Sequence, residues 1–166
     1  MILGTTRKLM DNLKTGFQNV VVLNDKSFWD WHAHIFIYNR RKCVIAINNL
    51  TRYCIILYGL RAEHFKNFDS ILLSAMRGTF IAEGFDNQKV DRYIEACGQV
   101  ICTKTYNRSI IGSLNDFLYL AEYKMAECDL TKMNLVDLNR CMGKFVSSKL
   151  DLIFPIEMLK REFEKL

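Results

Sequence analysis

The hydrophobic and polar positions in the first third of the chain alternate as they do in a β-sheet. In residues 31–38 one side of the pattern is apolar, and the other side carries His32 and His34 before two aromatic residues. A period of two predicts a strand, and the apolar runs at residues 43–48 and 52–58 predict two partner strands. We therefore expect an antiparallel three-stranded meander.

The first turn of this meander decides which residues of its strands face each other. Pairing Tyr38 with Cys43 leaves a four-residue connection and keeps both faces of the strand pair largely apolar. The connection contains three consecutive cations, which this pairing places at the tip of the hairpin: Arg40, Arg41 and Lys42. Cations at a hairpin tip are well placed to contact phosphates, and they also discourage edge-to-edge aggregation.

After residue 61 the apolar residues recur at steps of three and four, which is typical of helices. Helices are predicted from Phe65 to the stop at Gly84 and over residues 87–96, 109–128, 134–150 and 155–165. Further short strands are expected at residues 1–5, 20–23 and 99–103, with a helix reaching Leu13 after the first of them. The predicted class is α+β, with a small antiparallel sheet (the meander plus one or two strands) and about five helices.

The chain is predicted to form a single domain over residues 1–166. Its only proline is Pro155, and no linker rich in glycine or serine divides it. Residues 1–61 are expected to be mostly β, and residues 62–166 mostly helical. One compact unit is also the usual outcome for a chain of this length.

Positive charge is concentrated in the N-terminal part of the chain. Residues 1–61 carry nine Lys or Arg and three Asp or Glu, a net charge of +6, whereas residues 62–166 carry fourteen and fifteen, a net charge of −1. Such asymmetry predicts an anionic partner, either nucleic acid, an acidic protein or a small phosphorylated ligand. The alternative interpretation is a solvated surface with scattered cations.

Several classes of protein are disfavoured by what the sequence lacks. No apolar run reaches the roughly 18 residues of a membrane span, and the start does not resemble a signal peptide. The six cysteines form no CxxC pair, so we interpret them as reduced, mostly buried residues of a cytoplasmic protein. His32 and His34 lack a third ligand, and common nucleotide, hydrolase and metalloprotease motifs are absent, so we predict neither metal nor cofactor.

Residues 103–117 lead from a β-like run into the most regular helix. Asn107 suits the cap position, and Arg108 adds charge beside the unpaired N–H groups of the first turn. Arg108, Gly112 and Asn115 fall on one stripe of this helix, together with Tyr119. The start of the helix with Arg108 could hold a phosphate or carboxylate, or the polar stripe of a capped helix could instead hydrogen-bond buried loops. A mid-helix glycine costs about 1 kcal/mol against alanine, which suggests a close approach at Gly112.

These motifs together resemble a bacterial family catalogued as domain of unknown function 6933. The resemblance is carried by "WHA" at residues 31–33, "RRKC" at 40–43, the turn with Asn48 and Thr51, "NRSIIGSLND" at 107–116, and a start of the form "MIL..T.KL". It covers roughly residues 1–120 and is weak in the C-terminal helices. The family pattern has Asp at the position of Asn39 and Asn at that of Tyr106. The resemblance implies a small bacterial, plasmid-borne or phage-borne cytosolic protein and no particular activity.

Three hypotheses of function follow from these features. The first is a non-enzymatic binding protein, such as a mobile-element regulator or a phage inhibitor of host defence. Its cationic concavity for nucleic acid or an acidic protein would join the hairpin tip to the helix start at Asn107, Arg108 and Ser109. The second is an enzyme acting on a phosphorylated or nucleotide-like small molecule, with His32 as acid/base, Arg108 holding the anion and Asn115 or Asp116 orienting. The third is a protein-binding role, including a homodimer.

Overall fold

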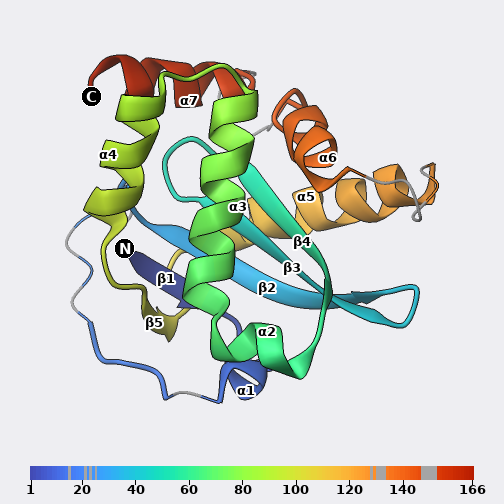
Figure 1. The fold of residues 1–166 in the computed structure, drawn as a ribbon. Coiled ribbons are helices and arrows are strands. Elements are labelled where there is room, and N and C mark those ends of the chain that lie inside the picture. The colour runs from blue at the N-terminus through green and yellow to red at the C-terminus, as the bar shows by residue number, and fades with distance from the viewer. Residues whose placement is uncertain are drawn as a thin grey trace.

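The computed structural model describes residues 1–14, 16–20, 22, 24, 26–127, 129, 134–146 and 153–166. Its centre is one sheet in the strand order β4-β3-β2-β1-β5 (Figure 1). The strands are β1 (Ile2–Thr5), β2 (Trp31–Tyr38), β3 (Arg41–Asn48), β4 (Cys54–Leu60) and β5 (Ile101–Lys104). The α+β class and the antiparallel β2–β3–β4 meander are confirmed.

The other two strands make the sheet mixed, so that it is antiparallel in the meander and parallel on both sides of β1. β1 pairs in parallel with β2 on one side and with β5 on the other. Parallel strands need a long connection, and β1 is separated from β2 by a helix and a loop. The alternation pattern predicts a strand but carries no information on its direction.

The predicted register of the hairpin was wrong by two residues. Tyr38 faces Arg41, so the connection is the two-residue turn of Asn39 and Arg40, both at positive φ (45° and 60°). A turn of this kind matches the twist of the flanking strands, and asparagine tolerates its first position well. Because the error is an even number of residues, each side chain keeps its predicted face.

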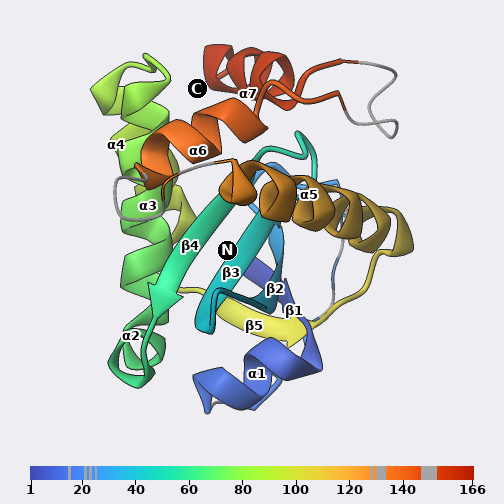
Figure 2. The same cartoon turned by 90° about the vertical axis from the view of Figure 1, so that its right-hand side faces the viewer.

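Helices cover both faces of the sheet (Figures 1 and 2). In the described part of the chain there are seven rather than about five: α1 (Arg7–Leu13), α2 (Ala62–Lys66), α3 (Phe68–Ala82), α4 (Asn87–Cys97), α5 (Arg108–Ala126), α6 (Leu135–Met142) and α7 (Pro155–Glu164). Asn67 divides one predicted helix into α2 and α3. The helix predicted over 134–150 ends at Met142. Residues 147–152 lie outside the described residues, as do residues 21 and 23 of the strand predicted at 20–23.

Two hydrophobic cores lie on opposite faces of the sheet. Trp31, Ala33 and Ile35 of β2 point into the larger core, with buried residues of α1, α3, α4 and α7. Phe36 points the other way, into a core shared with α5 and α6. The period-two pattern of β2 therefore correctly predicted which of its residues share a face. The core side chain of Trp31 also donates from Nε1 to the hydroxyl of Tyr93 (3.0 Å).

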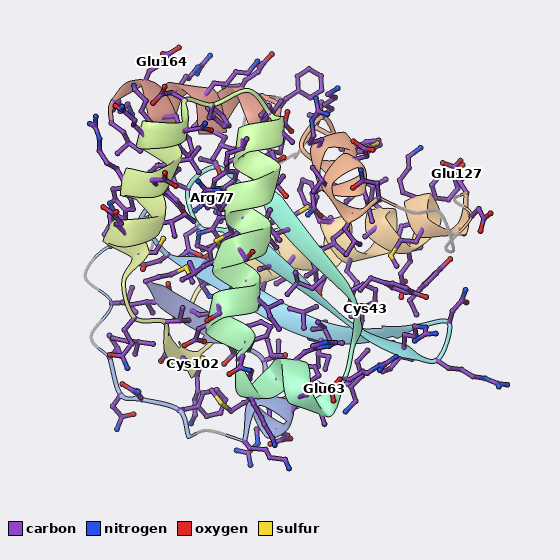
Figure 3. All side chains as sticks on the ribbon, viewed as in Figure 1. Cys43, Glu63, Arg77, Cys102, Glu127 and Glu164 are labelled. Carbon is purple, nitrogen blue, oxygen red and sulfur yellow. The ribbon has the colours of Figure 1, made fainter. Side chains whose placement is uncertain are left out.

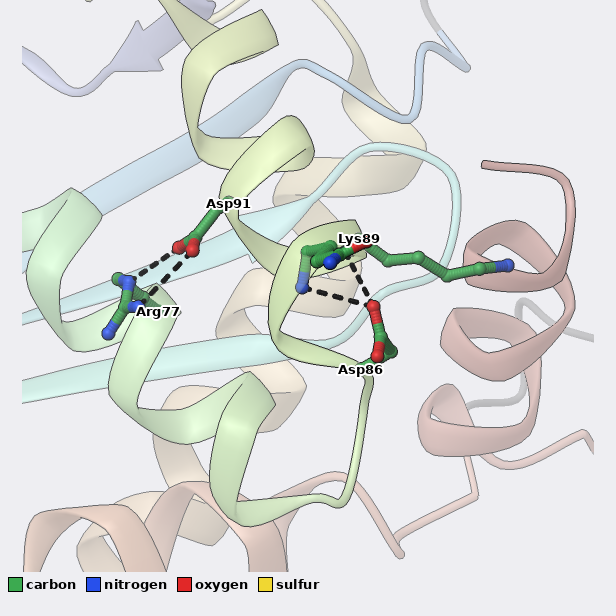
Figure 4. A network of polar contacts seen from close by, with 5 residues as sticks. Arg77, Asp86, Lys89 and Asp91 are labelled. Carbon is green, nitrogen blue, oxygen red and sulfur yellow. Dashed lines mark hydrogen bonds and ion pairs between the residues drawn. The ribbon is translucent and has the colours of Figure 1, made fainter.

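Polar contacts join α4 to α3 and to α7, and Figure 4 shows the contact with α3 and the cap at the start of α4. Arg77 Nε lies 2.7 Å from Asp91 Oδ1, and Lys89 Nζ donates to the carbonyl of Phe163 at 2.8 Å. The Asp86 carboxylate caps α4 by accepting from two backbone N–H groups. The cap is expected to contribute about 1 kcal/mol, more than the exposed ion pair.

Most of the described cysteines are buried, as the sequence predicts. Five cysteines are free thiols, of which Cys43, Cys54 and Cys97 are buried, Cys102 is half-buried and Cys141 is exposed. Cys128 lies outside the described residues. Burial raises the pKa of the Cys54 thiol well above its usual range. None of the helices described is long and apolar enough to cross a membrane.

Candidate functional site

A cavity of about 260 Å³ lies beside the tip of the β2–β3 hairpin, and cationic side chains dominate its lining. We call it the cationic pocket and define it by four cations: Arg40, Arg41, Lys42 and Arg61. The first three are the predicted tip residues. The sequence did not predict Arg61 as a site residue. Arg61 is the single residue between the end of β4 and the start of α2.

Irregular backbone at the end of β4 brings Arg61 to the hairpin tip. The β3–β4 pairing shifts register between Lys42 and Val44, and Gly59 opposite has φ +75°, which glycine adopts without strain. The Cδ of Arg41 lies 3.7 Å from where a Cβ on Gly59 would stand. The chain therefore turns beneath the hairpin and leaves a pocket there.

Lys42 is the best anchored of the four cations. Its Nζ donates to Oδ1 of Asn12 on α1 (2.6 Å) and lies 5.6 Å from the ring centroid of Phe65 on α2. These contacts fix the position of the Lys42 charge beside α1 and α2, and all four cations of the pocket, Lys42 included, are exposed. Exposed arginines beside a positioned lysine are well suited to bind an anion.

The electrostatics of the cationic pocket favour an anion. Within the described ranges, no carboxylate forms an ion pair with any of the four cations. Glu63, two residues after Arg61, lies on α2 at the edge of the molecule (Figure 3). One nearby acid does not neutralise four cations, so a bound phosphate or carboxylate would relieve their mutual repulsion.

His32 lies at the opposite end of β2, in a closed hydrogen-bond network. Its side chain is fully buried, and its Nδ1 lies 2.8 Å from Oδ1 of Asn49, while the Tyr106 backbone N–H donates to Nε2 at 3.3 Å. Asn49 Nδ2 also donates to the Tyr106 hydroxyl at 2.7 Å. The imidazole is thus neutral with its proton on Nδ1. Both nitrogens are engaged, so neither is available for a substrate proton.

Burial lowers the pKa of His32, the hydrogen bond that its Nδ1–H donates to Asn49 raises it by a smaller amount, and the charge of Arg52 lowers it further. The His32 imidazole of the unfolded chain therefore takes up a proton at a higher pH than the imidazole of the folded protein does.

The free energy of unfolding should fall by up to about 1 kcal/mol as pH drops from about 7.5 to about 5.5. Urea titrations at both pH values should show a smaller fall for His32→Gln, and an equal fall in both proteins would contradict this.

The start of α5 has the predicted cap and an exposed first turn. The Asn107 side chain accepts from the N–H groups of Ser109 and Ile110, at 2.9 and 3.1 Å. Arg108 and Ser109 are exposed. The cap side chain itself occupies two of the first-turn donors that an anion would use.

The predicted site residues fall into two separate groups. Tyr106 connects His32 to the start of α5, so His32 and Arg108 lie at the same end of β2. The cationic pocket lies at the other end, on the order of 25 Å from His32 at 3.3 Å per residue. Asn115 and Asp116 are exposed two turns along α5, about 12 Å from Arg108 at 1.5 Å per residue. One concavity joining the hairpin tip to Arg108 is therefore not formed.

The sequence interpretation missed the partners of His32 and the fourth cation. Asn49 follows a buried strand beside Asn48, and paired asparagines at such a turn are a signal of side-chain bonding to the backbone. Tyr106 carries no comparable signal, because it reaches His32 only through the β1–β5 pairing. Arg61 could be found only from the bulge opposite Gly59.

The described residues contain no group of three or more His, Cys, Asp or Glu side chains that could hold a metal ion. His34 is engaged separately, with its Nδ1 3.0 Å from Oγ1 of Thr6. The two neighbouring histidines of β2 therefore bond to different partners rather than converging. Of the described residues that the sequence predicted as site residues, those of the hairpin tip line a cavity, and we take the cationic pocket as the candidate site.

Fold and site together define an α+β protein with a cationic hairpin pocket beside a mixed five-stranded sheet. The chain belongs to the family described as a domain of unknown function, DUF6933, whose model matches residues 2–158. This extends the resemblance from the N-terminal two-thirds into the C-terminal helices. A comparison with curated proteins gives no match.

Proposed function

We propose that this protein is a non-enzymatic nucleic-acid-binding protein that places the tip of the β2–β3 hairpin against the phosphate backbone. One observation carries the proposal. The hairpin tip projects beyond the body of the molecule (Figure 1), and all four cations of the pocket are exposed. A two-stranded ribbon of this kind fits the major groove of a duplex, which is about 12 Å wide.

The chemistry of the cationic pocket agrees with backbone contacts rather than with base recognition. Its polar groups are positive charges, and phosphate contacts of Arg and Lys position a protein without reading sequence. We therefore expect binding that is strong at low salt and shows little sequence preference. Such an activity suits a cytoplasmic regulator of a mobile element, and it also suits a phage inhibitor of host defence.

The enzyme hypothesis has less support from the geometry. His32 is buried with both ring nitrogens engaged, and Asp116 lies two turns along α5 from Arg108. A general base needs hydrogen-bond access to its substrate. We therefore retain the binding function as the proposal.

The test is fluorescence-polarisation binding of short single- and double-stranded DNA and RNA across a salt series. Arg40→Glu/Arg41→Glu should weaken binding by about tenfold or more and reduce the salt slope by about two. Lys144→Glu/Lys160→Glu is the matched control, because it changes the net charge equally at two exposed positions far along the chain. It should reduce binding much less.

Two results would overturn the proposal. One is the absence of binding to any of these nucleic acids at low salt, which would turn attention to an acidic protein partner. The other is an equal loss of affinity in the tip variant and in the control. That result would assign binding to overall charge rather than to the hairpin.

A further inference from the structure

The outer face of α5 is an exposed surface with an unusual composition. Tyr119 is 78% exposed and Tyr123 is 56% exposed, so large aromatic side chains lie in contact with water. Tyr119 lies on one stripe of the helix together with Arg108, Gly112 and Asn115. We call this stripe the α5 outer face. The buried side of the same helix packs on β2 and β3.

Gly112 leaves a notch in this face that no contact between described residues explains. A glycine in the interior of a helix costs about 1 kcal/mol against alanine. A Cβ at Gly112 would meet no atom within 4 Å, so no close approach among the described residues accounts for the missing side chain. A notch of this kind lets a side chain of another molecule pack directly on the helix backbone.

From this face we infer that a second copy of this chain docks on it, with the two α5 helices antiparallel. The spacing is self-complementary about Asn115. Arg108 lies seven residues before Asn115 and Glu122 seven residues after it, so Arg108 of each copy meets Glu122 of the other. In the same alignment, Tyr119 of one copy faces Ile111 of the other, and its ring, which leans toward the N-terminus of its own helix, reaches the adjacent Gly112. A two-fold contact of this kind is closed and gives a dimer rather than a fibre.

The charges of the helix support this arrangement over a parallel one. Arg108 is exposed and Glu122 half-buried, and neither forms an ion pair within the described part of the chain. Asp116 is also exposed and lies beside Asn115. In the dimer, the side-chain amide of Asn115 from one copy can donate a hydrogen bond to the Asp116 carboxylate of the other. Antiparallel helices also place the positive end of each helix dipole beside the negative end of the other.

The α5 dimer is independent of the proposed nucleic-acid binding. The cationic pocket lies on the hairpin tip and α2, and none of its residues belongs to the α5 outer face. The face is a single helix surface, smaller than a standard stable interface, so we expect a dissociation constant in roughly the micromolar range. Loss of nucleic-acid binding would leave the dimer unaffected.

Sedimentation velocity on the full chain over a concentration series tests the inference. Arg108→Glu and Glu122→Arg should each raise the dimer dissociation constant about tenfold or more, because each places like charges opposite one another. An equimolar mixture of the two variants should restore dimers, because both contacts then pair opposite charges. A loss of fold would not be reversed by mixing, which separates docking from a structural effect.

A second pair of variants tests the notch. Gly112→Gln should abolish dimers by occupying the place of Tyr119 of the second copy. Gly78→Gln is the matched control, because Gly78 also lies inside a helix with open space around its missing side chain. A monomeric wild type at about 1 mM would overturn the inference, as would a mixture that fails to restore dimers or equal effects of the two glutamine substitutions.

Discussion

Replacing Asn48 by alanine is expected to lower the free energy of unfolding by about 3–5 kcal/mol, the largest single effect on stability that we predict. Asn48 is fully buried at the end of β3. Its Nδ2 donates to the carbonyl of Phe28 (2.7 Å), and its Oδ1 accepts from the N–H groups of Leu50 (3.1 Å) and Thr51 (2.9 Å). Alanine would leave several buried backbone groups without partners.

Chemical denaturation with two further variants makes this prediction specific. Asn48→Asp keeps the acceptor for Leu50 and Thr51 but loses the donor to Phe28, so its cost should be intermediate. Asn87→Ala at an exposed helix position is the control and should change stability by less than about 0.5 kcal/mol. A loss below about 1 kcal/mol for Asn48→Ala would show that water replaces the side chain at this turn.

Replacing Gly4 by alanine should cost about 2–3 kcal/mol, because the new methyl group would collide with His32. A Cβ at Gly4 would lie 2.7 Å from Cδ2 and from Nε2 of that imidazole. The ring cannot move freely, since Asn49 and the Tyr106 backbone hold its two nitrogens. The close approach of ring and backbone therefore requires glycine at this position of β1.

A double-mutant cycle with His32→Ala checks the cause of this loss. In the His32→Ala background the collision is absent, and Gly4→Ala should then cost less than about 1 kcal/mol. The coupling between the two positions should be about 1–2 kcal/mol. The same cost in both backgrounds would instead assign the effect of Gly4→Ala to the strand itself.

The alternation of residues 31–38 was sufficient to predict a strand and the face of each side chain, because burial selects residues directly by face. It did not predict the turn. A four-residue connection and the observed two-residue turn at Asn39 and Arg40 leave the same residues on each face, so hydrophobicity cannot distinguish them. The parallel direction of β1 depends on contacts with β5, which no local pattern contains.

The candidate site was predicted in part, for a similar reason. Arg40, Arg41 and Lys42 are consecutive, so the sequence alone places them together at a tip. Arg61 joins them only through the irregular pairing at the end of β4. His32 has a residue type that suits catalysis, yet its role depends on the two partners that bury it. Sequence shows that a histidine is present and does not show whether its nitrogens are occupied.

The position of β1 has a consequence for the order in which the nascent chain can fold. β1 lies between β2 and β5, and Ile2 pairs with Ile101. The meander β2–β3–β4 uses local contacts and can form early, whereas β1 cannot complete its pairing until β5 has left the ribosome. During that interval β1 has an unpaired edge, and the incomplete sheet is open to misassociation. Chaperone binding during synthesis would be most useful at this stage.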